Sequence, residues 1–184
     1  MKRWAIVLLA ISLLLLSACG NGEEKAFLNF ANELRKAEEI SFNADLKAEY
    51  GGLTADFKLK FSETDGNATV EIIKPKILKG VKAHLSKGSA ELEYDGAILD
   101  LGFLSDDLNP MSALSLMRRA ITEGHLDLAW SEEEMLCVRL VPEDGKTVKL
   151  WLDTETMTPQ TAEIASGEKT SVFIEIHDWE AKGK

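Results

Sequence analysis

The two cysteines have the most distinctive chemistry in this chain, because a thiol can be acylated, oxidised or used as a nucleophile. Cys19 ends the stretch LLLSAC (residues 14–19), a long aliphatic run followed by two small residues. Cys137 lies more than a hundred residues further on, between Leu136 and Val138. These settings predict modification at Cys19 and apolar packing for Cys137, with a reactive thiol as the alternative for Cys137.

The segment before Cys19 has the layout of an export signal. Lys2 and Arg3 give it a positive start, and the 13 residues from Trp4 to Leu16 are apolar except for one serine. This run is too short to span a bilayer, which takes about 20 apolar residues. The motif LSAC (residues 16–19) resembles the lipobox of bacterial lipoproteins. The resemblance implies that residues 1–18 are a lipoprotein signal peptide and that Cys19 is diacylated; the alternative is an ordinary secreted protein.

Acylation of Cys19 would decide where the mature protein resides. Two acyl chains, such as palmitate, give a stable membrane anchor that one chain does not. Residues 19–22 are therefore interpreted as a lipidated cysteine and a short tether on the extracytoplasmic face of a bacterial cell membrane. Gly20 is not an acidic retention residue, so an outer-membrane destination stays open in a host with two membranes.

Size and charge restrict the function of the remaining chain. The 184-residue chain has a formal net charge of −10, and loss of the signal peptide would remove two further positive charges. Nucleic-acid binding depends on Lys and Arg that neutralise phosphates, so this acidic balance argues against it. A single domain of this size buries about 68–70% of its unfolded surface and needs no disulfide or metal to fold.

Periodicity predicts a helix followed by a hairpin. Apolar residues at Phe27, Phe30, Ala31 and Leu34 fall on one face of a helix over residues 23–39. Strict alternation of apolar and polar residues then runs through 42–50 and 53–61, on both sides of a glycine pair. Such alternation predicts a β-hairpin with one apolar face.

Turn signals divide the rest of the chain into further strands. Asp65-Gly66 and Asp95-Gly96 predict short hairpins. Asn109-Pro110 predicts the start of a helix over 111–123 that Gly124 closes. Strands are predicted near residues 68–75, 81–85, 92–94, 97–101, 125–130, 135–141, 147–153, 161–165 and 171–179.

These elements predict an α+β fold in which residues 23–184 form one domain. About 10 to 11 consecutive antiparallel strands cannot stay flat, because the right-handed twist of strands curls a large sheet. We therefore expect a strongly curved antiparallel half-barrel. Its apolar face becomes concave, and the N-terminal and mid-chain helices are the elements available to cover it.

The order of elements resembles the LolA/LolB/RseB-like half-barrel superfamily. The stretches that carry the resemblance are KPKILKGVKAHL (74–85), LEYDGAILDL (92–101) and VKLWLDTETMTPQTAEI (148–164). In that family a Trp-x-Asp strand is followed by a turn with proline, as at Trp151, Asp153 and Pro159. The resemblance implies a cup lined by apolar side chains, and an arginine that helps to hold the cup shut. Neither Arg118 nor Arg119 is matched to that role.

The resemblance also implies a function. The cup would take a hydrophobic ligand, either a lipid or a lipoprotein acyl chain, and the protein would be a membrane-anchored lipoprotein. The alternative is a regulator that binds an envelope protein, as germination lipoproteins of the GerS type bind a cell-wall amidase. The candidate cavity residues, which either line the cup or fill it as ordinary core, are Phe42, Leu46, Leu53, Phe57, Leu59, Phe61, Leu114, Met117 and Ile121.

Nothing in the sequence indicates an enzyme. His84, His125 and His177 fall on separate predicted strands, without Cys, Asp or Glu at metal-ligand spacing. The chain has no Gly-x-Ser-x-Gly, His-Glu-x-x-His or phosphate-binding glycine motif. We therefore expect no catalytic site, no metal site and no cofactor.

Overall fold

The computed structural model describes residues 21–50, 52–86, 89–102, 108–142, 145–166 and 170–183. Its helices are α2 (Asn21–Lys36), α3 (Pro110–Glu123) and the short 3-10 helix η1 (Lys76–Leu78). Its strands are β1 (Glu39–Tyr50), β2 (Leu53–Thr64), β3 (Asn67–Lys74), β4 (Lys82–Ser86), β5 (Ser89–Tyr94), β6 (Ala97–Gly102), β7 (His125–Glu132), β8 (Met135–Val141), β9 (Thr147–Asp153), β10 (Pro159–Ser166) and β11 (Thr170–Lys182). The predicted signal peptide and Cys19 lie outside the described residues.

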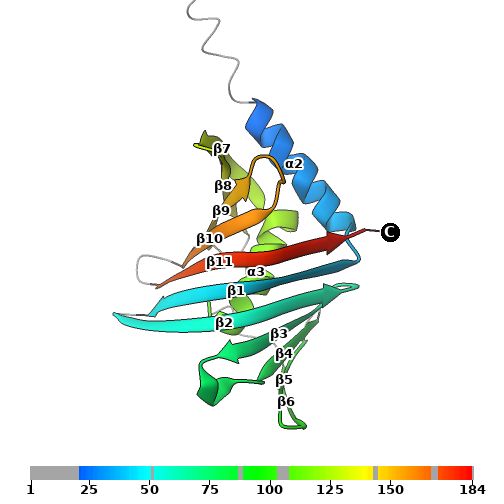
Figure 1. Cartoon of the computed structure of the whole chain (residues 1–184), viewed down its shortest axis with the longest axis vertical. Coiled ribbons are helices and arrows are strands. Elements are labelled where there is room, and N and C mark those ends of the chain that lie inside the picture. Colours follow the sequence, from blue (N-terminus) through cyan, green and yellow to red (C-terminus); the bar gives the residue numbers. More distant parts are fainter. Residues whose placement is uncertain are drawn as a thin grey trace, which may run out of the picture.

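The eleven strands form one antiparallel sheet in the order β6-β5-β4-β3-β2-β1-β11-β10-β9-β8-β7 (Figure 1). The sheet is strongly curved and does not close, since β6 and β7 form its two edges. Within the described residues two α-helices accompany it, and both contribute to the core on its concave face. The predicted α+β half-barrel with an N-terminal and a mid-chain helix is confirmed.

Two of the tight turns have the backbone conformation that their sequences predict. Asp65 and Gly66 have φ angles of 51° and 76°, and Asp95 and Gly96 have φ angles of 51° and 78°. Positive φ at both central residues is the type I′ turn, whose twist matches that of the strands it joins. The Asp-Gly pairs therefore position β3 beside β2 and β6 beside β5.

The start of α3 is stabilised by its predicted cap. The Asn109 side chain accepts hydrogen bonds from the backbone nitrogens of Met111 and Ser112, at 3.0 and 2.9 Å. At the other end Gly124 has φ −68° and is extended, not left-handed as a helix-closing glycine usually is. A Cβ at Gly124 would lie 2.5 Å from the Ala120 carbonyl oxygen, so glycine is needed there for close approach.

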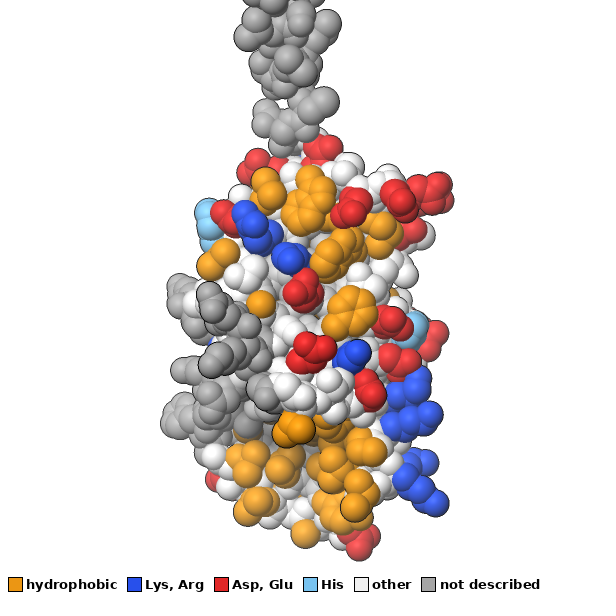
Figure 2. All heavy atoms as spheres, turned by 90° about the vertical axis from the view of Figure 1, so that its left-hand side faces the viewer, with side chains coloured by type: hydrophobic (Ala, Val, Ile, Leu, Met, Phe, Trp, Pro, Cys, Tyr) orange, Lys and Arg blue, Asp and Glu red, His pale blue; other side chains and the backbone are white. Residues whose placement is uncertain are grey.

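A single hydrophobic core joins both helices to the concave face. The β1–β2 register places Phe42, Ala44 and Leu46 on this face, opposite Phe61, Leu59 and Phe57. Because both helices and the sheet share this core, we expect residues 20–184 to fold without the predicted signal peptide. In the part of the chain that the structure describes, no helix is both long and apolar enough to cross a membrane. On the side of the molecule that Figure 2 shows, hydrophobic side chains gather at the lower end, and others lie near the upper end.

Cys137 is a packing residue of β8. Its side chain is fully buried, and Sγ donates a long hydrogen bond to Glu132 Oε2 at 3.7 Å. Burial first, and the neighbouring Glu132 carboxylate second, raise the pKa of Cys137 to about 11. The thiol is therefore protonated at neutral pH, as the packing interpretation requires.

We predict that Cys137 reacts slowly with a thiol reagent in the folded domain. At about pH 8 the raised pKa makes the thiolate fraction of Cys137 about 200-fold smaller than that of a free thiol. Burial slows the reaction further. The folded state holds the thiol proton more tightly than the unfolded state does. Ionisation of Cys137 should therefore lower the free energy of unfolding only as the pH rises from about 9 to about 11. The absorbance of a reacted disulfide reagent, with and without guanidinium, measures the rates. Native Cys137 reacting as fast as the unfolded thiol would contradict this prediction.

Candidate ligand-binding face

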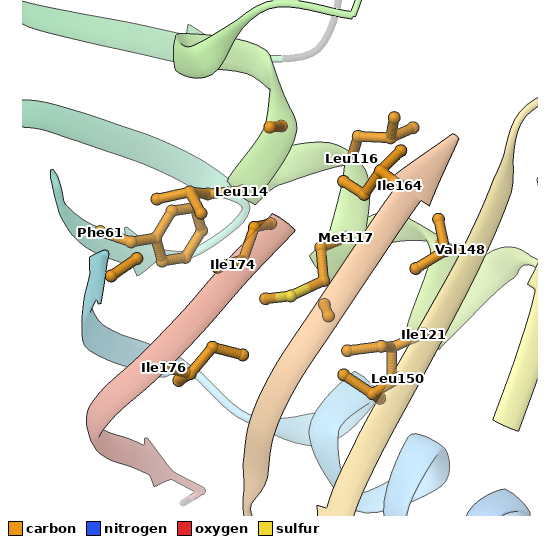
Figure 3. Packing of buried hydrophobic residues seen from close by; sticks show 14 of the residues in the cluster. Phe61, Leu114, Leu116, Met117, Ile121, Val148, Leu150, Ile164, Ile174 and Ile176 are labelled. Carbon is orange, nitrogen blue, oxygen red and sulfur yellow. The ribbon is translucent and has the colours of Figure 1, made fainter. Parts of the chain in front are cut away.

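Helix α3 fills the middle of the concave face. Figure 3 shows Met117 and Ile121 pointing from α3 toward the sheet, where Leu150 of β9, Ile164 of β10 and Ile174 of β11 point back. All five side chains are at most 2% exposed. The middle of the predicted cup is therefore a packed core.

Seven of the nine predicted cavity residues belong to this core. Phe42 stacks on Phe61 with ring centroids 4.7 Å apart, and on Trp179 at 5.1 Å. The seven, each at most 2% exposed, are Phe42, Leu46, Leu59, Phe61, Leu114, Met117 and Ile121. The sequence left open whether these residues line an open cup or fill it as ordinary core. Their burial fits core packing better, and their contact with a ligand stays a prediction.

The other two predicted residues lie toward an uncovered margin of the same face. Along β2, Leu53 is 76% exposed, Phe57 is half-buried and Leu59 is 1% exposed. All three point to the concave side, because side chains two residues apart on a strand share a face. Cover on this face therefore decreases toward the β1–β2 hairpin.

The cover also decreases toward the edge strand β6. One row of register partners crosses the sheet from β1 to β6: Phe42, Phe61, Val70, Ala83, Leu92 and Leu99. The first four are at most 3% exposed, Leu92 is half-buried and Leu99 is 61% exposed. Tyr94, on the same face two residues after Leu92, is 54% exposed. We call Leu92, Tyr94 and Leu99 the open end.

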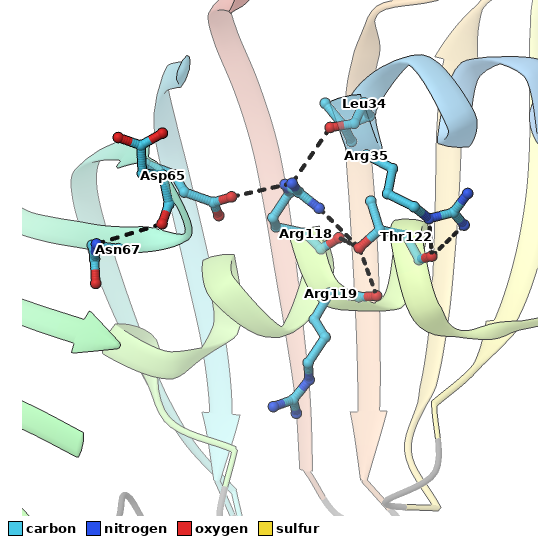
Figure 4. Close-up of polar contacts among 8 residues, drawn as sticks. Leu34, Arg35, Asp65, Asn67, Arg118, Arg119 and Thr122 are labelled. Carbon is cyan, nitrogen blue, oxygen red and sulfur yellow. Dashed lines mark hydrogen bonds and ion pairs between the residues drawn. The ribbon is translucent and has the colours of Figure 1, made fainter. Parts of the chain in front are cut away.

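A polar cluster around a largely buried ion pair fixes α3 over the filled part of the sheet (Figure 4). Arg118 of α3 pairs with Glu63 of β2 at 3.1 Å, and the two side chains are only 12% and 14% exposed. Arg118 also donates to the Leu34 carbonyl of α2 at 3.4 Å and to the Thr122 hydroxyl at 2.8 Å. Arg35 of α2 donates to the Thr122 carbonyl. One arginine thus joins both helices to the sheet.

This role of Arg118 is not apparent from the sequence. The resemblance implied an arginine that holds the cup shut, but neither Arg118 nor Arg119 was matched to that role. The sequence gives little indication of these contacts, because Glu63 and Leu34 are far from Arg118 along the chain. Only Thr122 lies one helical turn away.

We predict that Arg118→Leu lowers the free energy of unfolding by about 3 kcal/mol, because it leaves Glu63 buried without its partner. The double variant Arg118→Leu, Glu63→Leu should recover most of that loss. The matched control is Lys36→Ala, which breaks an exposed pair with Glu33 and should change stability by less than about 0.5 kcal/mol. Urea denaturation measures all three, and equal effects of Arg118→Leu and Lys36→Ala would refute the role of the cluster.

The convex face has a shallow groove of mixed charge. It has a volume of about 630 Å³ and includes Asp45 of β1 and Glu175 of β11, which are register partners. Ligand atoms of Asp45, Glu175 and His177 lie within 4.8 Å of one another, a donor set that suits a divalent cation. However, Lys58 Nζ contacts both carboxylate oxygens of Asp45, which neutralises that carboxylate without an ion. Sequence spacing could not reveal this trio, because it forms across strands.

No protein-family model and no curated protein sequence matches this chain. Solved structures do match it. An uncharacterized conserved protein from Thermus thermophilus is 8% identical, with a TM-score of 0.52 over 88% of each chain. A LolA superfamily protein from Nitrosomonas europaea is 13% identical, with a TM-score of 0.49 over 87% of this chain and 94% of that one. A structure of the CwlD amidase from Clostridioides difficile in complex with the GerS lipoprotein matches at 17% identity and a TM-score of 0.38, over 79% and 87%.

The fold is similar to the half-barrel of these solved structures. The strand order, the open edges and the two helices agree with the half-barrel that the sequence predicted. At these identities the similarity concerns the fold alone, and a fold hosts many functions. The function of this domain must therefore be argued from its own surfaces.

Proposed function

We propose that this protein is a lipoprotein of the bacterial envelope, anchored on the extracytoplasmic side through Cys19, which binds an apolar ligand at the open end of its half-barrel. The observation that carries the proposal is the row from Phe42 to Leu99, which runs from full burial to 61% exposure on one face of one sheet. The ligand is an acyl chain of a lipid or of a lipoprotein.

The chemistry of the open end suits such a ligand. Leu92, Tyr94 and Leu99 continue the concave apolar surface beyond the part that α3 covers. Removing apolar surface from water is favourable by about 25 cal/mol per Å². An acyl chain that lies along this row would therefore bind favourably without displacing α3. No rearrangement of the Arg118 cluster is needed.

A second candidate is a protein-binding regulator, the alternative raised by the GerS-type resemblance. The observation that favours it is the filled centre of the cup, where Met117 and Ile121 are at most 2% exposed. An exposed apolar margin without a deep cavity also suits the hydrophobic side chains of a partner protein. The ligand experiment below separates the two candidates.

We predict that residues 20–184, purified without the anchor, bind a fluorescent fatty acid and carry lipid detectable by mass spectrometry of a solvent extract. Leu99→Asp should weaken binding of the fatty acid at least about tenfold, because it places a charge on the apolar row. The matched control is Ile98→Asp. Ile98 is 66% exposed and adjacent in sequence, but it opposes Glu93 on the convex side, so this variant should bind as the wild type does.

Either of two outcomes would overturn the ligand proposal. One is a folded wild-type domain that carries no lipid and binds no fatty acid, which would favour the protein-binding candidate. The other is equal binding by the Leu99→Asp and Ile98→Asp variants, which would place the ligand elsewhere. Circular dichroism confirms that each variant is folded.

We predict that Cys19→Ser abolishes acylation of the protein. The full-length wild-type protein should incorporate labelled palmitate and enter the detergent phase on Triton X-114 partitioning, since two acyl chains anchor stably. The serine variant should incorporate no palmitate. If its signal peptide is removed, it should also leave the detergent phase. The Cys137→Ser variant is the control and should remain acylated. Acylation of the Cys19→Ser protein would show that the anchor lies elsewhere.

A further inference from the structure

The turn between β3 and β4 is basic, although the protein as a whole is acidic. Residues 74–82, which we call the basic tip, have the sequence KPKILKGVK and contain four lysines and no acid. The whole chain has 21 basic and 31 acidic residues. A cluster of one sign against the net charge indicates a specific electrostatic partner, in this case an anionic one.

The basic tip also exposes apolar side chains. Ile77 is 85% exposed, the most exposed large apolar side chain among the described residues, and Leu78 is 38% exposed. Lys74, Lys76 and Lys79 on either side of them are also exposed. Aliphatic side chains flanked by lysines are the composition of segments that lie in the interfacial region of a membrane.

The exposure of Ile77 follows from a well-defined backbone. Leu78 donates to the Pro75 carbonyl at 3.0 Å, and Val81 donates to the Leu78 carbonyl at 3.1 Å. Gly80 and Ile72 join the turn to β3, because Gly80 N donates to Ile72 O at 2.9 Å. These bonds hold η1 as a fixed projection, so Ile77 is presented to the surroundings without any rearrangement.

The basic tip lies far from the start of the domain. Figure 1 shows η1 projecting near the lower end of the molecule, whereas α2 begins at the upper end beside β7. The upper end is acidic: Glu23 accepts a hydrogen bond from Ser131, close to the Glu132–Glu134 turn. Hydrophobic side chains gather over the lower end in Figure 2. The two ends therefore differ in charge.

We propose that the basic tip docks on an anionic lipid surface. Ile77 and Leu78 enter the interfacial region, and the lysine ammonium groups lie among the lipid phosphates. A projecting pair of aliphatic residues suits a deformable interface, whereas a groove would suit a folded partner. This contact brings the open end, on neighbouring strands of the same sheet, close to a source of acyl chains.

The test is co-sedimentation of the unacylated domain, residues 20–184, with lipid vesicles. We expect binding to phosphatidylcholine vesicles with about 30 mol% phosphatidylglycerol, weaker binding to pure phosphatidylcholine, and a decrease with added salt, since surface charges are screened. Ile77→Asp should reduce binding at least about tenfold. Leu128→Asp is its matched control, because Leu128 is an exposed aliphatic residue on β7, and it should bind as the wild type does.

A second pair of variants tests the charges. Lys76→Gln with Lys79→Gln should weaken binding about 20- to 30-fold, at about fivefold for each lysine near the surface. Lys25→Gln with Lys36→Gln on α2 changes the net charge equally and should have little effect. Wild-type protein that does not prefer anionic vesicles, or a tip variant that binds like its control, overturns the proposal.

This inference does not depend on the proposed ligand function. The vesicle assay needs no occupant at the open end, so Leu99→Asp should bind vesicles as the wild type does. Loss of fatty-acid binding with normal vesicle binding therefore tests the ligand function alone. Normal fatty-acid binding by the Ile77→Asp variant would in turn show that only docking is lost.

Discussion

The structure depends on one constraint, which is how much apolar sheet a short helix can cover. Helix α3 has 14 residues and is about 21 Å long. Eleven strands about 4.8 Å apart make a sheet about 48 Å wide before it curves. Even with α2 beside β7 and β8, the described helices cannot cover all of this face. The β5–β6 margin is left with exposed apolar residues, and the proposed ligand function rests on it.

The polar contacts of Arg118 decide which part of the sheet is covered. By joining α3 to Glu63 of β2 and to Leu34 of α2, this residue keeps the helix over the central strands. Breaking such a buried pair is costly, so the helix is held firmly in place. The domain therefore offers an apolar margin beside a packed core, and the basic tip lies at the same end of the molecule as this margin.

The helices and strands were predicted well from local patterns, because each element depends mainly on residues that are neighbours in the sequence. Alternation along residues 53–61 predicted which side chains of β2 face the core. It could not predict that Leu53 would be 76% exposed and Leu59 only 1%, since that depends on where α3 lies. The role of Arg118 and the closeness of Asp45 to Glu175 were equally hidden, because both depend on contacts between distant parts of the chain.

The most direct test of the account is a crystal structure of residues 20–184 with a fatty acid brominated along its chain. Anomalous scattering from bromine locates the ligand without assumptions about its contacts. The account predicts bromine beside Leu92 and Leu99, with Met117 still packed between α3 and the sheet. Bromine between α3 and β10 or β11, or none on the concave face, would contradict it.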